Sequence, residues 1–289
     1  MDWVPLLFMD DVCHHLNKPA FNQVSQLSGS WPSFGAEHRE KRREFDFRCR
    51  VSNQEVSYSM RDISRYSREL TVADVNLEFD RITSFECGSA SSNNPRVSRR
   101  VNRVSLREFE RDILPTVASL VANCSLYLHA LRSAQNQIFF NAFKNSSVFN
   151  EITAREQGEE SRAFIAHQLE FGNVQNLTLY GTGGWPEEEN LGETLKIFVS
   201  STRFYQLNSP DLWRDESELF ELFLERALAN ELKKGASIST PGTNLDKNRL
   251  LALHPECRHD SEEDAWRIPD SNLRIALRHD FVMLCVRVE

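Results

Sequence analysis

The sequence lacks any run of apolar residues long enough to cross a lipid bilayer. The longest early run, Val4 to Met9, is flanked by Asp2 and by Asp10 and Asp11, so it is too short and too acidic for the core of a secretory signal. The six cysteines lie far apart and form no Cys-x-x-Cys pair, which excludes a zinc ribbon and a dense disulfide framework. We therefore expect a cytoplasmic or nuclear protein without a membrane partner, whose cysteines are reduced and mostly packed.

Glycine and proline are scarce, with 11 and 10 copies in 289 residues, and hydrophobic residues make up 40% of the chain. This composition excludes a fibrous or largely disordered protein and provides enough apolar area for a sizeable core. Acidic residues outnumber basic ones, 42 to 34, and the formal net charge of -8 repels phosphate backbones. We expect no nucleic-acid partner.

The first thirty residues predict short helices. Pro5 can start a helix, and the apolar residues after it recur at helical spacing. A second helical pattern begins at Pro19 and is expected to end at Pro32, because proline interrupts a helix. The charged residues 35–44 then predict a solvated linker helix.

Beyond residue 44 the pattern changes to strands and then to a repeat. Strict alternation at 45–51 and again at 56–60 predicts a β-hairpin, and a polar break at about 88–96 predicts a flexible loop. Strand-like runs then recur roughly every 25 to 32 residues, with helical patterns between them. The runs lie at 125–129, 148–152, 176–180, 204–208 and 236–240, and the main helical patterns at 161–171, 191–201 and 216–232.

A strand, a covering helix and another strand in the same sheet require right-handed crossovers and give parallel strands. The predicted fold class is therefore α/β: a short N-terminal helical module, then a parallel β-α arc that resembles leucine-rich repeats. C-terminal segments at 266–269, 273–277 and 281–288 are expected to close the arc as antiparallel strands. We expect two domains, residues 1–34 and 35–289.

The opening segment, from Val4 and Pro5 to Trp31, resembles the F-box, which has a Leu-Pro start, short helices and a closing tryptophan. Val4 stands where the F-box has leucine, and Ser28 to Ser30 stand where it commonly has a valine-cysteine-basic triplet. The whole chain is similar to the nematode-expanded family of F-box-related proteins, in which such a box precedes divergent leucine-rich-like repeats. The further segments that carry this resemblance are Leu177 to Gly181, Gly184 to Pro186, Leu195 to Ser201 with Arg203 and Phe204, and Trp266 to Pro269.

The resemblance implies a substrate receptor of a cullin–RING ubiquitin ligase. Its F-box-like module at 1–34 would bind the adaptor subunit of the ligase, and its arc would present a target protein. A helical module of about thirty residues buries too little to be stable alone, so its apolar residues are better covered by a partner. The expected adaptor-binding residues are Pro5, Leu6, Leu7, Phe8, Val12, Leu16, Leu27 and Trp31.

Target binding is expected at arginines and aromatic residues. The arginines between Arg96 and Arg111 suit a phosphorylated or acidic partner, or else serve only as a solvated surface. Aromatic residues of the repeat region can anchor an interface or lie in the core. The candidate target-binding residues are Arg99, Arg100, Arg103, Tyr180, Trp185, Tyr205 and Trp213.

The sequence carries no catalytic signature, metal-binding motif or cofactor motif, so we predict a binding protein rather than an enzyme. Two alternatives remain. The first is an interaction scaffold without ligase attachment, which the departures at Val4 and at Ser28 to Ser30 favour. The second is an enzyme with a site at the carboxyl ends of parallel strands, near Gly181.

Overall fold

The structure is a computed structural model. It describes residues 4–52, 54–65, 69–89, 101–129, 133–155, 158–180, 189–209, 217–241, 258–260, 265–267, 273–278 and 283–288. The chain divides into two compact units, Met1–Asn150 and Glu151–Glu289, and each is described by itself.

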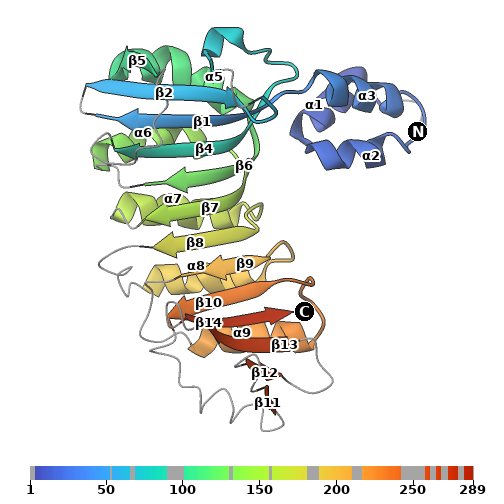
Figure 1. The fold of residues 1–289 in the computed structure, drawn as a ribbon, viewed down its shortest axis with the longest axis vertical. Coiled ribbons are helices and arrows are strands. Elements are labelled where there is room, and N and C mark those ends of the chain that lie inside the picture. The colour runs from blue at the N-terminus through green and yellow to red at the C-terminus, as the bar shows by residue number, and fades with distance from the viewer. Residues whose placement is uncertain are drawn as a thin grey trace. The chain divides into compact units, whose positions relative to one another are not determined.

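The first unit begins with a helical module, which we define as residues Leu6 to Lys41. The backbone N–H groups of Phe8 and Met9 donate to the carbonyl of Pro5, at 3.0 and 3.1 Å, and so start the first helix. Buried Met9 and Cys13 lie four residues apart on this helix and form its packed face. The module consists of α1 (Leu6–His15), the 3-10 turn η1 (Lys18–Ala20), α2 (Phe21–Val24) and α3 (Trp31–Lys41), shown in blue in Figure 1.

Two expectations for this module are wrong. Pro32 does not end a helix, because it lies in the first turn of α3, where a backbone N–H has no intrahelical partner and proline is tolerated. The segment 35–44 is helical only as far as Lys41, and it is not solvated throughout, because α3 buries Gly35 and His38. Helix α3 packs on α1 and α2, and it runs through residues 34 and 35, between which the two expected domains meet.

The sheet of the first unit combines a hairpin with parallel strands. Strands β1 and β2 pair antiparallel, which confirms the expected hairpin, and β1, β4 and β6 pair parallel. Gly88 and Ser89 belong to β4, so a loop that begins at 88 is wrong, and residues 90–96 of that loop lie outside the described residues. The strands are β1 (Glu44–Val51), β2 (Glu55–Asp62), β3 (Glu69–Leu70), β4 (Arg81–Ser89), β5 (Asn102–Ser105) and β6 (Val121–Leu128), in the spatial order β6-β4-β1-β2-β3 with β5 also on β2.

Phenylalanine rings form the core under this sheet. The ring of Phe85 stacks on Phe47 at a centroid distance of 5.3 Å and meets Phe139 and Phe143 edge to face at 6.0 and 5.5 Å. Such pairs add to the stabilisation that burial of aromatic area provides. The helices that contribute to this core are η3 (Phe109–Ile113), α5 (Leu114–Leu120) and α6 (Ser133–Phe143), and the short α4 (Leu106–Glu108) leads into η3 without a buried residue.

The second unit repeats a strand and a helix along the chain. Its strands β7 to β10 pair parallel in sequence order, which confirms the expected α/β class with a mostly parallel sheet. Leu177 and Leu179 are buried while Thr178 and Tyr180 are half-buried, so the strands turn alternate residues to opposite faces. The elements are β7 (Phe149–Arg155), α7 (Glu159–Glu170), β8 (Asn176–Tyr180), α8 (Glu189–Ser200), β9 (Gln206–Asn208), α9 (Ser217–Leu228) and β10 (Ser237–Pro241).

Antiparallel strands follow this parallel part, as expected. Strand β14 pairs with the edge of β10, and β13, β12 and β11 continue the order outward. Helices α7, α8 and α9 lie on one face of the second unit's sheet, and Figure 1 shows no described helix on the other face. The closing strands are β11 (Arg258–Asp260), β12 (Ala265–Arg267), β13 (Leu273–Arg278) and β14 (Met283–Val288).

Candidate functional site

The first turn of α1 carries large apolar side chains that face solvent. Leu6, Leu7 and Phe8 are 60%, 85% and 54% exposed, and we call these three residues the apolar patch. Full burial of such a side chain from water provides about 1.5 to 3 kcal/mol, and these three residues forgo the part of it that corresponds to their exposed surface. Consecutive exposed residues of this size are typical of a surface that another molecule covers.

The other expected adaptor-binding residues surround or extend this patch. Trp31 is half-buried and meets the ring of Phe8 edge to face at a centroid distance of 6.4 Å. Leu27 is 49% exposed on the turn that follows α2. Pro5 is exposed, while Val12 and Leu16 are half-buried farther along the module.

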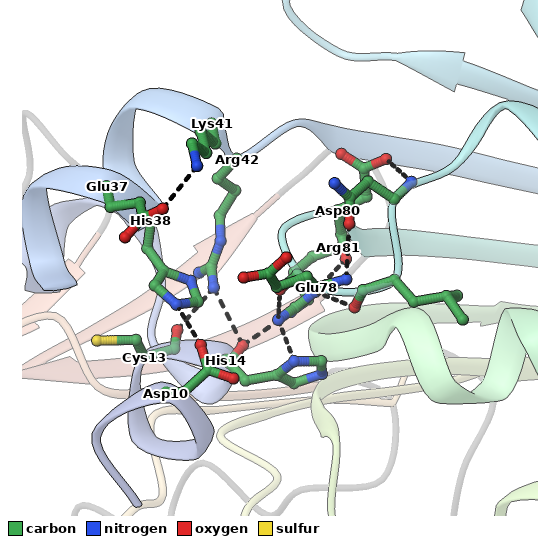
Figure 2. Close-up of polar contacts among 12 residues, drawn as sticks. Asp10, Cys13, His14, Glu37, His38, Lys41, Arg42, Glu78, Asp80 and Arg81 are labelled. Atoms are coloured by element: carbon green, nitrogen blue, oxygen red, sulfur yellow. Dashed lines mark hydrogen bonds and ion pairs between the residues drawn. The ribbon is translucent and has the colours of Figure 1, made fainter. Parts of the chain in front are cut away.

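Arg42 holds the far end of α1. Its guanidinium group donates to the backbone carbonyls of Cys13, at 2.6 Å, and of His14, at 3.2 Å (Figure 2). It also donates to the carbonyl of Leu16. The last carbonyls of a helix have no intrahelical partners, so a cation there both satisfies them and complements the helix dipole. Arg42 is only 4% exposed, and burial lowers its pKa.

Arg81, the first residue of β4, reaches the same end of α1. Its Nε donates to the carbonyl of His14 at 2.9 Å, and another of its nitrogens contacts His14 Nδ1 (Figure 2). It also donates to the carbonyls of Leu77, Glu78 and Asp80. Arg81 is 1% exposed, and burial followed by the charge of Arg42 lowers its pKa to about 9. The end of α1 is therefore fixed to the sheet.

A partly buried hydrogen bond between His38 and Asp10 joins α3 to α1. His38 Nε2 lies 2.7 Å from Asp10 Oδ1, and the His38 ring packs between Phe21 and Phe79 at centroid distances of 6.2 and 5.1 Å. Burial lowers the pKa of His38, and the hydrogen bond and charge of Asp10 oppose this effect. Together with Arg42 and Arg81, this pair holds α1 in one orientation, with the apolar patch outward.

The expected target-binding residues are only partly described. Arg103 is exposed on β5, in the first unit, opposite Ser57 of β2. Tyr180 and Tyr205 are half-buried in the second unit, and a Cβ atom on Gly235 would lie 2.5 Å from the Tyr205 hydroxyl, so this tyrosine packs on the Gly235 backbone. Arg99, Arg100, Trp185 and Trp213 lie outside the described residues, as does Gly181.

Sequence reasoning missed a charged cluster on the first unit's sheet. Glu86 of β4 contacts Arg50, Arg48 at 3.4 Å, and His129 at 3.3 Å. The hydrogen bond from His129, followed by that from Arg50, holds the pKa of Glu86 at about 2. Arg48 and Arg50 lie two positions apart on β1, so they share one face of the sheet. This spacing is the sequence pattern from which the cluster could have been predicted. Because this carboxylate is paired with cations and has a low pKa, it suits a structural role better than proton transfer at neutral pH.

Among the described residues, no helix combines the length and the apolar character that a bilayer-spanning segment requires. In the same part of the chain, no three His, Cys, Asp or Glu side chains converge as a metal ion would need. The fold and the site thus define a mixed α/β protein with an apolar patch on a fixed helical module. The sequence matches no protein-family model, and comparisons with curated proteins and with solved structures give no match either.

Proposed function

We propose that this protein is a non-catalytic receptor that recruits a target protein to a cullin–RING ubiquitin ligase. In this proposal the helical module is F-box-like and binds the adaptor subunit through the apolar patch and its neighbours Leu27 and Trp31. The observation that carries the proposal is the exposure of Leu6, Leu7 and Phe8 on a helix whose opposite face is packed. We propose that the protein carries out this function in the cytoplasm or the nucleus.

The β-α units of the second unit support the other half of the proposal. Parallel strands with helices on one face are the arrangement of leucine-rich-like repeats, which use the uncovered face to bind proteins. Thr178 and Tyr180 of β8 lie on the opposite face from its buried leucines, and Asn208 of β9 is the strand neighbour of Thr178. We propose that this polar face contributes to target binding.

Fixation of α1 matters for a receptor without chemistry of its own. Such a protein accelerates modification only by holding the target near the ligase, which raises the effective concentration. A loosely tethered module would hold the target in many orientations, and the effective concentration at the ligase would then be lower. The bonds from Arg42 and Arg81 to the end of α1 restrict this freedom.

Copurification of the full chain with the adaptor subunit tests the proposal. Leu7→Asp places a charge on an 85% exposed residue, so the protein should stay folded and lose the adaptor. Leu228→Asp is the matched control, because Leu228 is an exposed leucine on α9, in the other unit, and its substitution should keep adaptor binding. Binding that survives Leu7→Asp unchanged would contradict the proposal.

One observation favours the alternative of a scaffold without ligase attachment. The carbonyls of Cys13 and His14 are bound by arginines of the chain itself, so the module is folded onto its own sheet. A scaffold predicts no copurification of the adaptor with the unchanged protein. The same experiment therefore separates the two functions.

A further inference from the structure

A cavity that is open to solvent lies between the helical module and the sheet of the first unit. Its volume is about 210 Å³, which exceeds the space that a few water molecules need. We call it the junction cavity, because the connection after α1 forms one wall and strands β4 and β6 form another. Its lining residues are Leu16, Asn17, Lys18, Pro19, Arg42, Glu44, Arg81, Thr83, Ala122, Asn123 and Asn150.

The backbone of the sheet is irregular at this cavity. The pairing of β4 with β6 shifts register between Ile82 and Ser84, and the pairing of β1 with β4 shifts there too. Asn123 has a positive φ of 46° and donates from Nδ2 to the carbonyl of His15 at 2.6 Å. Bulges of this kind redirect side chains and are common beside binding sites.

The lining is polar and positively charged. It contains Lys18, Arg42 and Arg81 against the single carboxylate of Glu44, and Lys18 Nζ lies 3.8 Å from Glu44 Oε2. Both arginines donate to the carbonyl of His14, so two buried guanidinium groups lie close together (Figure 2). Their like charges oppose each other, which an anion in the cavity would relieve.

Some of the buried polar atoms here have unused hydrogen-bonding capacity. Arg42 Nε and Asn150 Oδ1 are buried and have no hydrogen-bond partner among the described residues. A buried polar atom without a partner costs about 1 to 3 kcal/mol, so both atoms destabilise this junction.

We propose that the junction cavity binds the phosphate group of a small phosphate ester. Phosphate suits the lining better than carboxylate, because the donors come from separate elements and a tetrahedral group presents oxygens in several directions. A phosphate monoester carries a charge of about -1.5 to -2 at neutral pH, which matches the excess of cationic side chains. Lys18 and Glu44 keep partly exposed side chains and form the entrance.

Occupancy would strengthen the attachment of the helical module. The ligand would contact Lys18, which follows α1, and Arg81, which begins β4. It would thus connect the helical module to the sheet, two parts that must separate when the module detaches. A ligand that binds only the closed arrangement stabilises it by linkage. This inference does not depend on adaptor binding, so the result of the adaptor experiment neither supports nor contradicts it.

Calorimetric titration of the full chain with inorganic phosphate and with glycerol 3-phosphate tests the proposal, against sodium chloride of matched ionic strength. We expect saturable binding of both probes and slower hydrogen exchange of α1 when they are bound. Lys18→Met should raise the dissociation constant about tenfold, since it removes one polar contact.

Lys41→Met is the matched control, because Lys41 is exposed on α3 and pairs with Glu37 outside the cavity. Its dissociation constant should equal that of the unchanged protein. Absence of saturable binding, or equal affinity in Lys18→Met and the unchanged protein, would overturn the proposal. Arg42→Met is not used, since it would also free the end of α1.

Discussion

Arg81 Nε donates a hydrogen bond of 2.9 Å to the backbone carbonyl of His14, a residue 67 positions earlier in the chain. The bond joins the start of β4 to the end of α1. Because Arg81 is fully buried, the bond is shielded from competing water. The N-terminal helices are thus part of the fold of the first unit, although their apolar patch faces outward.

Replacement of Arg81 by methionine should lower the free energy of unfolding by about 3 kcal/mol, because it removes one partner of a buried charged network. Methionine keeps much of the packing but leaves the carbonyls of His14 and Glu78 without this donor. Urea unfolding measures the loss, and hydrogen exchange should show faster exchange of α1 amides. Arg111→Met is the control, since Arg111 is exposed and pairs with its neighbour Asp112, and it should leave the free energy of unfolding nearly unchanged. Equal losses in both variants would show that Arg81 does not fix α1.

Stability of the first unit should fall as the pH drops from neutral to about 4. Burial, followed by the charges of Arg81 and His15, lowers the pKa of His14 from 6.5 to about 4, and Arg42 adds to this effect. The unfolded chain therefore takes up this proton near pH 6.5, before the folded chain does. The neutral ring favours the folded state fully above that pH, and the contribution is lost by about pH 4.

The free energy of unfolding, measured across this pH range, checks the expectation. His14→Asn keeps an acceptor for Arg81 and removes the titration, so its stability should depend less on pH between 6.5 and 4. His167→Asn, at an exposed histidine of α7, should keep the slope of the unchanged protein. If the free energy of unfolding of His14→Asn depends on pH as strongly as that of the unchanged protein, groups other than His14 cause the loss of stability in acid.

Much of the repeat could be predicted from the sequence, because its strands and helices obey simple periods. In β8 two buried leucines alternate with polar residues, and α9 carries its apolar residues on one face. Strand β4 was missed for a physical reason. Relative to β1, Thr83 is an extra residue in β4, so Ile82 and Phe85 are both buried at a spacing of three and the alternation is lost.

Of the candidate site, only the apolar patch could be predicted from the sequence. Leu6, Leu7 and Phe8 stand together in the sequence, whereas the partners of Arg42 and Arg81 are backbone carbonyls distant in the chain. A carbonyl has no side-chain signature, and an arginine is usually exposed, so no local pattern indicates that these two are buried. The junction cavity depends on the same long-range contacts and was missed with them.

The four cysteines of the first unit should react slowly in the folded protein. Cys49 and Cys87 face each other on β1 and β4 with their Sγ atoms 3.3 Å apart, and burial raises the pKa of Cys87. Cys13 and Cys124 are buried too, in agreement with the expectation of packed free thiols. Alkylation with iodoacetamide, mapped by mass spectrometry, should be about a hundredfold slower at these four residues than in urea, because it requires unfolding. Rapid labelling of Cys87 in the folded state would contradict its burial.

Two helical glycines should respond to alanine with opposite signs. A Cβ atom on Gly35 would lie 2.7 Å from Val24 Cγ1, where α3 crosses α2, whereas a Cβ atom on Gly192 of α8 meets nothing within 4 Å. Alanine favours a helix over glycine by about 1 kcal/mol, so Gly192→Ala should stabilise the protein by roughly 0.5 to 1 kcal/mol. At Gly35 the stiff valine cannot yield without moving α2, and overpacking outweighs that gain, so Gly35→Ala should destabilise by about 1 to 2 kcal/mol. Urea unfolding of the two variants measures both changes. Stabilisation by Gly35→Ala would mean that the two helices do not approach this closely, and the packed face that turns the apolar patch outward would then need another explanation.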